Sequence, residues 1–327
     1  MQSAHADFFV GVAAFERGDY ATALEHWQPM AEQGIAVAQN NLGVMYDHGL
    51  GVEEDDAQAV GWYRLAAEQG NAQSQYSLGL MYGNGHGVPE DDRAAVKWYR
   101  LAAEQGSVNA QYHMALVYDF GEGVGEDDAI AATWYRKAAE LGDSRAQYNL
   151  GLLYDFGSGV QQDKREALKW YRKAARQGDA KAQYMVGVSH FNGEGTPTDK
   201  VKGYAWLTLA AYQRHVRALQ HRAEVWATLT PQERDAAKTL RKQLAGKLAL
   251  LKRLGMPVSA DAAVSLAPKE LLRDIQAALR NNGFDPGPTD GRMGPRTRDA
   301  IRAFQRSFGL AETGEPSRGL LQLIRIQ

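Results

Sequence analysis

A pattern of 36 residues recurs along most of the first two thirds of this 327-residue chain. Trp-Tyr pairs begin at positions 62, 98, 134 and 170, and glutamines stand at positions 39, 75, 111, 147 and 183. Self-similarity with a period of about 20 to 50 residues is typical of solenoids, in which each unit buries its apolar face against its neighbours. The sequence therefore predicts a stack of similar modules rather than one globular core.

Each module divides into two predicted helices. In one copy, apolar residues at helical spacing occupy positions 146–154, and Gly157 and Gly159 then end the helix. Asp163 stands at an N-cap position, and a second apolar stripe over 164–177 ends at Gly178. Gly151 lies inside the first helix, where glycine is about 1 kcal/mol less favourable than alanine. We expect another backbone segment to pass closely at this glycine.

Several residues recur together within each copy. The pattern is A-x-x-x-L-G-x-x-Y-x-x-G-x-G-V, then an Asp, then A-x-x-W-Y-x-x-A-A-x-x-x-G. It resembles the Sel1-like repeats, which are relatives of the tetratricopeptide repeats, from residue 36 to about residue 212. In the fifth copy His190 replaces the tyrosine and Thr196 the valine, as expected of a capping repeat. The resemblance implies an adaptor for other proteins, often at the cell envelope.

The last 60 residues carry a second resemblance. Two predicted helices flank a turn-rich loop, and a short third helix is predicted over 317–324. The matching residues include Gly283-Phe284, Asp290-Gly291, Gly294-Pro295, Phe304-Gln305 and Gly309-Leu310. They resemble the small peptidoglycan-binding domain found beside many cell-wall hydrolases. The resemblance implies that peptidoglycan is a partner of this chain.

The predicted fold class is all-α, with five parts in chain order. A helical-hairpin solenoid of about five Sel1-like repeats, the last degenerate, is followed by a terminal hairpin and a small three-helix domain. A capping box at Thr230, with Pro231 at the first helical position, supports the terminal hairpin. The expected boundaries are 1–35 for an N-terminal capping hairpin, 36–214 for the repeats, 215–254 for the second capping hairpin, 255–267 for a linker and 268–327 for the peptidoglycan-binding-like domain.

Candidate peptidoglycan contacts lie in the loop and at the start of the second helix of the last domain. Arginine can pair with the carboxylates of peptide stems, and the free N–H groups at a helix start favour anions. An aspartate in the loop either contacts the sugar or caps a turn. The candidates are Asp290, Arg292, Arg296, Thr297 and Arg298.

Candidate contacts to a protein partner lie where the repeats differ. Residues that are identical in every copy must serve packing that every copy shares, so specificity is expected at variable positions on one face of the first helix of each repeat. Large aromatic side chains there are candidate anchors, although they could instead pack against the next repeat. The candidates are Asn41, Ser77, His113, Phe120, Asn149 and Phe156.

Several classes of function lose support. Residues 1–214 contain 18 Lys and Arg residues and 28 Asp and Glu residues, which gives a net charge of −10. An acidic surface of this kind binds nucleic acid poorly. No apolar run reaches the roughly 20 residues of a membrane span. No cysteine and no catalytic motif occur, so we expect neither a cofactor nor catalysis. Acid pairs such as Asp55-Asp56 precede each second helix and are interpreted as helix caps rather than metal ligands.

The N-terminus bears on where the protein acts. Ala4-His5-Ala6 followed by Asp7 looks like the small-residue end of a signal-peptide cleavage site. With the two resemblances, this favours a periplasmic adaptor that joins an unknown envelope protein to peptidoglycan. Two alternatives remain: an envelope enzyme, either β-lactamase-like or accessory to a cell-wall hydrolase, and a cytoplasmic adaptor.

Overall fold

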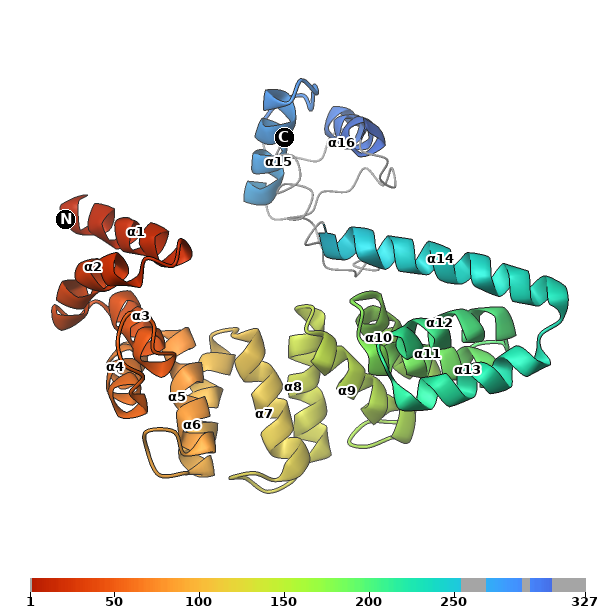
Figure 1. Cartoon of the computed structure of the whole chain (residues 1–327), viewed down its shortest axis with the longest axis horizontal. Coiled ribbons are helices and arrows are strands. Elements are labelled where there is room, and N and C mark those ends of the chain that lie inside the picture. The colour runs from red at the N-terminus through yellow and green to blue at the C-terminus, as the bar shows by residue number, and fades with distance from the viewer. Residues whose placement is uncertain (1, 254–268, 290–294, 308–327) are drawn as a thin grey trace. The chain divides into compact units, whose positions relative to one another are not determined.

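The computed structural model describes residues 2–253, 269–289 and 295–307, and every regular element within those ranges is an α-helix (Figure 1). The all-α fold class is therefore confirmed. The chain divides into two compact units, residues 1–174 with 188–198 and residues 175–187 with 199–327. The predicted third helix of the last domain lies outside the described residues.

Most helices are of similar length and pack as consecutive antiparallel pairs, as the 36-residue period predicts (Figure 1). The helices are α1 (Gln2–Glu16), α2 (Tyr20–Glu32), α3 (Ala36–Asp47), α4 (Asp56–Glu68), α5 (Ala72–Asn84), α6 (Asp92–Glu104), α7 (Val108–Phe120), α8 (Asp128–Glu140), α9 (Ser144–Phe156), α10 (Lys164–Arg176), α11 (Ala180–Asn192), α12 (Lys200–Tyr212), α13 (Val216–Thr228), α14 (Pro231–Arg253), α15 (Lys269–Asn281) and α16 (Pro295–Ser307).

The helix boundaries follow from local chemistry. The first aspartate of each acid pair is an N-cap: the carboxylates of Asp55, Asp91 and Asp127 accept the backbone N–H three residues later at 2.9–3.0 Å. This satisfies one of the donors that a helix start leaves free. The prediction that these acids cap helices is confirmed. At the other end, Gly121 closes α7 with a φ of 72°, a conformation that glycine adopts without strain.

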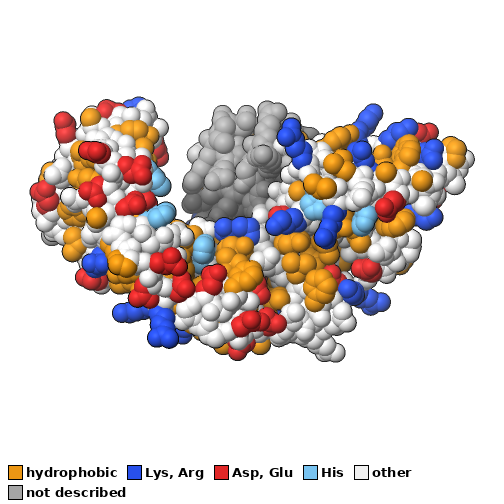
Figure 2. All heavy atoms as spheres, turned by 60° about the horizontal axis from the view of Figure 1, so that its bottom comes forward, with side chains coloured by type: hydrophobic (Ala, Val, Ile, Leu, Met, Phe, Trp, Pro, Cys, Tyr) orange, Lys and Arg blue, Asp and Glu red, His pale blue; other side chains and the backbone are white. Residues whose placement is uncertain are grey.

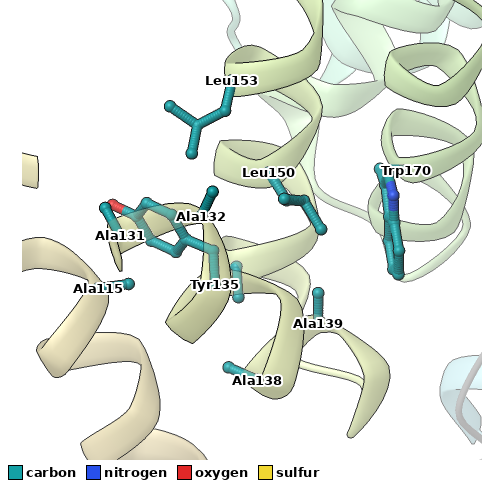
Figure 3. Close-up of a cluster of buried hydrophobic side chains, with 10 residues drawn as sticks. Ala115, Ala131, Ala132, Tyr135, Ala138, Ala139, Leu150, Leu153 and Trp170 are labelled. Carbon is teal, nitrogen blue, oxygen red and sulfur yellow. The ribbon is translucent and has the colours of Figure 1, made fainter. Parts of the chain in front are cut away.

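In three repeats a buried tyrosine ring lies against a glycine of the first helix. A Cβ added at Gly151 of α9 would lie 2.5 Å from the Tyr171 ring, and one at Gly79 of α5 would lie 2.6 Å from the Tyr99 ring. The backbone of the second helix passes there as expected, with the carbonyl oxygens of Ala167 and Ala95 each 3.3 Å from the Cβ positions at Gly151 and Gly79. A flat ring from the second helix of the same repeat fills that space, and Figure 3 shows Tyr135 beside Ala115, which replaces the glycine in one copy.

The repeat tryptophans join successive hairpins. Trp62 packs against the cluster of α1–α3, and Trp98 packs against the cluster of α4 and α5. Trp134 does the same with the cluster of α6 and α7, and Trp170 lies within the cluster of α8 and α9. Each indole thus packs on a cluster formed by the second helix of the preceding repeat and the first helix of its own repeat. The tyrosines beside them are the more deeply buried residues, at 0–5% exposed.

Polar side chains also repeat with the period. Gln69 Nε2 donates to Gln39 Oε1 and Gln105 Nε2 to Gln75 Oε1, both at 2.7 Å, so each pair joins the first helix of a repeat to the C-terminal end of the second helix of the same repeat. Arg136 donates to the Tyr154 hydroxyl at 2.6 Å. His190, which departs from the repeat pattern, lies 3.2 Å from the equivalent arginine and so occupies the place of that tyrosine.

Candidate functional site

The four polar candidates on the first helices are half-buried. Ser77 lies within hydrogen-bonding reach of the Tyr63 hydroxyl, and Asn149 within reach of the Tyr135 hydroxyl. Asn41 accepts a hydrogen bond from Asn40 at 3.3 Å. Burial and the neighbouring carboxylate of an aspartate raise the pKa of Tyr63 and Tyr135. These variable positions therefore face the buried tyrosines as well as the surface.

His113 lies in the most aromatic part of this face. Its ring centroid is 5.1 Å from that of Tyr99 and 5.4 Å from that of Tyr76 on the first helix of the preceding repeat. Arg145 lies 4.2 Å from the centroid of the Tyr112 ring. Burial, with the charge of Arg145, lowers the pKa of His113 below its ordinary value, so its neutral form is favoured near pH 7.

The first helices of successive hairpins lie side by side along this face. Ser74 Oγ donates to Asn40 Oδ1 at 2.8 Å across α5 and α3. Arg145 Nη2 donates to Asn109 Oδ1 at 2.9 Å across α9 and α7. Arg145 lies at a variable position of the same helical stripe, four residues before Asn149.

Phe120 and Phe156 are 66% and 70% exposed. Each is the last residue of a first helix and lies two turns beyond His113 or Asn149 on the same helical face. Lys164 Nζ lies 6.0 Å from the Phe156 ring centroid, which leaves most of that ring accessible. The alternative in which these two rings are buried by the next repeat is therefore wrong for the described structure.

The C-terminal candidates surround a loop that folds onto the start of α16. Asp285 accepts the Gly287 N–H at 3.0 Å, and Arg280 donates to the Thr289 hydroxyl at 2.6 Å and to the Gly287 carbonyl. Beneath the loop, Phe304 and Ile275 belong to a core formed by α15 and α16, and Phe284 packs on this core. The loop is thus fixed from both helices.

The three described C-terminal candidates have different environments. Arg296 is 73% exposed with its guanidinium 3.7 Å from Asp285, and Arg298 is also exposed. Thr297 is 2% exposed; its hydroxyl donates to the Pro286 carbonyl at 2.8 Å and accepts from Gln276 at 3.1 Å. The expectation that Thr297 contacts a ligand therefore needs correction, because its side chain holds the loop instead. Asp290 and Arg292 lie outside the described residues.

Charge differs between the two ends of the chain. Figure 2 shows acidic side chains gathered over the N-terminal helices and more Lys and Arg over the C-terminal ones, with small hydrophobic groups between them. Among the described residues, no group of three or more His, Cys, Asp or Glu side chains is arranged to hold a metal ion. In the same part of the chain, no helix is long and apolar enough to cross a membrane.

Comparison with known proteins identifies both parts. The Sel1 repeat model matches residues 5–35, 36–71, 72–107, 108–143, 144–179 and 180–215, so the expected N-terminal capping hairpin also matches as a repeat. The model described as a putative peptidoglycan binding domain matches residues 268–324. No curated protein matches the chain.

Two solved structures resemble it over most of its length. A Sel1 repeat protein from Oxalobacter formigenes has 32% identity and a TM-score of 0.62, over 74% of this chain and 96% of that one. A protective antigen of uropathogenic Escherichia coli with the SLR fold has 28% identity and a TM-score of 0.52, over 94% of this chain and 73% of that one.

Proposed function

Because this chain belongs to the Sel1 repeat proteins and carries a C-terminal peptidoglycan-binding domain, we propose that it is a non-catalytic adaptor of the bacterial envelope. Its repeats bind a protein, and its last domain binds peptidoglycan. The observation that carries the proposal is the pairing of these two domain types in one chain. Sel1 repeats support protein–protein interaction, and the family is typically non-catalytic.

The proposed peptidoglycan contacts are Arg296 and Arg298, together with Asp290 and Arg292 of the adjoining loop. Both described arginines are exposed at the start of α16, where backbone N–H groups also favour a carboxylate of the ligand. Co-sedimentation of the full chain with purified sacculi tests this. We expect Arg296→Glu with Arg298→Glu to reduce pelleting strongly, because charge reversal repels the stem carboxylates.

A matched control uses the same helix. Arg302 is exposed on α16 and lies 3.9 Å from Asp299, about one turn after Arg298 and less than two turns after Arg296. Arg302→Glu changes the charge of the domain by the same amount as either single substitution, so it should leave pelleting close to the wild-type level. Equal losses from Arg302→Glu and Arg296→Glu would show that the effect is general electrostatics.

The proposed partner surface runs along the first helices from Asn41 and Ser77 to His113, Asn149 and the two exposed phenylalanines. We place the anchors at Phe120 and Phe156, because large exposed aromatic side chains dominate binding energy at interfaces. Phe120→Asp and Phe156→Asp should abolish co-purification of an envelope protein and leave the thermal midpoint nearly unchanged. Leu141→Asp, at a residue 58% exposed at the C-cap of the second helix α8, is the control that should retain the partner.

The location and the lack of catalysis are parts of the same proposal. Fractionation of cells that express the complete gene should place the protein in the periplasm, whereas recovery with cytoplasmic markers would favour the cytoplasmic adaptor. Hydrolysis of nitrocefin or of labelled sacculi by the purified chain would instead favour the envelope enzyme.

A further inference from the structure

The four repeat tryptophans differ in whether the chain places a lysine over the indole ring. Lys137 Nζ lies 3.8 Å from the Trp134 ring centroid, and Lys173 Nζ lies 3.9 Å from that of Trp170. Lys97 Nζ lies 5.7 Å from the Trp98 ring centroid. These distances suit cation–π attraction, in which an ammonium group lies over the electron-rich face of an aromatic ring.

Trp62 has no such lysine within its helix α4. The residue directly before Trp62 is Gly61, whereas Lys97 stands directly before Trp98. The residue three positions after Trp62 is Leu65, whereas Lys137 stands three positions after Trp134. Because glycine and leucine occupy both positions from which the other repeats supply a lysine, no cation–π pair involves Trp62 among the described residues.

A cleft lies at this ring. It has a volume of about 390 Å³ and is lined by Gln58, Gly61, Trp62, Arg64, Leu65 and Glu68. A Cβ added at Gly61 would meet no atom within 4 Å, so the space beside the ring is open there. Leu65 is 47% exposed and offers an apolar wall, and the carboxylate of Glu68 is the acidic group of the lining.

One cation already lines the cleft. Arg64 Nη2 donates to the Tyr82 hydroxyl at 3.0 Å, the same contact that Arg100 makes with Tyr118 and Arg136 with Tyr154. This arginine therefore makes a contact that the next two repeats also make, and the cleft at Trp62 lacks the lysine that lies near the indole ring in the three following repeats.

We propose that this cleft receives a lysine side chain from a basic segment of a partner protein, whose ammonium group lies over the Trp62 ring as Lys137 lies over Trp134 and Lys173 over Trp170. The alkyl part of that side chain would pack on Leu65, and its charge would pair with Glu68. The net charge of −10 over residues 1–214 favours the approach of a basic segment. The site lies on second helix α4 and is independent of the surface that contains Phe120 and Phe156.

The test introduces a lysine into this chain beside the Trp62 ring, where it should compete with the lysine of the partner. The probe is a fluorescein-labelled nine-residue peptide with three lysines between glycines and serines, and its binding to the full chain is followed by anisotropy. Leu65→Lys places a lysine where Lys137 and Lys173 stand and should raise the Kd about five-fold, the effect of one exposed cation–π contact. The same peptide with acetylated lysines should bind no better to wild type than to Leu65→Lys.

The matched control is Leu101→Lys. It adds the same charge at the equivalent position of the next repeat, where Lys97 already lies over Trp98, so it should leave the Kd close to that of wild type. The indole N–H resonance of Trp62, assigned by its loss in Trp62→Phe, should move on addition of the lysine peptide. The proposal would be overturned if Leu65→Lys left the Kd for the lysine peptide unchanged, or if Leu65→Lys and Leu101→Lys weakened peptide binding equally. It would also be overturned if the Trp62 indole N–H resonance did not move on addition of the peptide.

Discussion

Two neighbouring repeats bury the same tyrosine in different surroundings. Tyr135 of α8 is 0% exposed and its hydroxyl donates to Asp119 at 2.7 Å; the equivalent hydroxyls of Tyr63 and Tyr171 also donate to an aspartate. Tyr99 of α6 is 5% exposed, but Gly83 stands where the others have the aspartate. Among the described residues, no hydrogen bond joins the Tyr99 hydroxyl to an aspartate.

The difference separates what the repeat needs from what it tolerates. All four rings are buried against the first helix, so the fit of the ring is common to every copy. The hydroxyl is present in all four copies, but its aspartate acceptor is present in three and is replaced by Gly83 in one, so this hydrogen bond adds stability without deciding the fold. Desolvation raises the pKa of Tyr99 as it does that of Tyr135, which shows that both hydroxyls lie in a poorly hydrated space.

The largest effect should come from removing the shared ring. Tyr135→Ala should destabilise the repeats by about 3–5 kcal/mol, because a large buried side chain is lost and the cavity only partly collapses. Tyr99→Ala should cost about the same. Urea unfolding followed by circular dichroism measures both. A much smaller loss for Tyr99 would mean that the ring is not the common element of the two repeats.

Removing only the hydroxyl should reveal the difference between the two repeats. Tyr135→Phe should cost about 1–2 kcal/mol, because it leaves the Asp119 carboxylate without its donor. Tyr99→Phe should change the urea midpoint very little. If Tyr135→Phe and Tyr99→Phe lost similar amounts of unfolding free energy, the hydrogen bond from Tyr135 to Asp119 would not explain the difference between the two repeats.

Restoring the acceptor should make the second repeat resemble the first. A Cβ at Gly83 would lie 3.4 Å from the Tyr99 hydroxyl and 3.6 Å from Ala95 Cβ, so an aspartate fits with small adjustments. Gly83→Asp should stabilise the chain by about 1 kcal/mol through the new hydrogen bond. Introducing Gly83→Asp into the Tyr99→Phe variant is the control, because the change in helix propensity is the same but the hydroxyl donor is missing. The gain in stability should largely disappear in that double variant.

The smallest effect concerns pH. His113 packs against Tyr99, whereas Asn149, which does not titrate, occupies the equivalent place beside Tyr135. Burial depresses the pKa of His113 from 6.5, so the unfolded chain binds a proton more readily than the folded one. This contribution to stability is complete above about pH 6.5 and decreases as the pH falls through the lower folded pKa.

Replacement of the histidine tests that contribution. His113→Asn gives both repeats the same residue at this position and should reduce the loss of stability between pH 7 and pH 5, measured as urea midpoints against wild type. Identical pH profiles for the two proteins would show that His113 does not contribute.

Much of the site follows from the sequence because the copies serve as controls for one another. Recurrence predicted the helix caps at Asp55 and Asp91, and variation pointed to the stripe that ends at Phe120. The lysines over the indole rings were not anticipated, because periodicity gives a residue's phase but not the direction of a long side chain.

The sequence by itself determined the period, the helix ends and the family of each part, since these depend on local propensity and on residues that recur at fixed spacing. The tertiary structure alone decided which residue fills the space at each repeat glycine and which polar candidates are accessible. Thr297 turned inward to hold a loop and Phe156 remained exposed, because burial depends on what an adjacent helix or loop covers. That information lies in the packing of residues distant in the chain and not in the pattern around either residue.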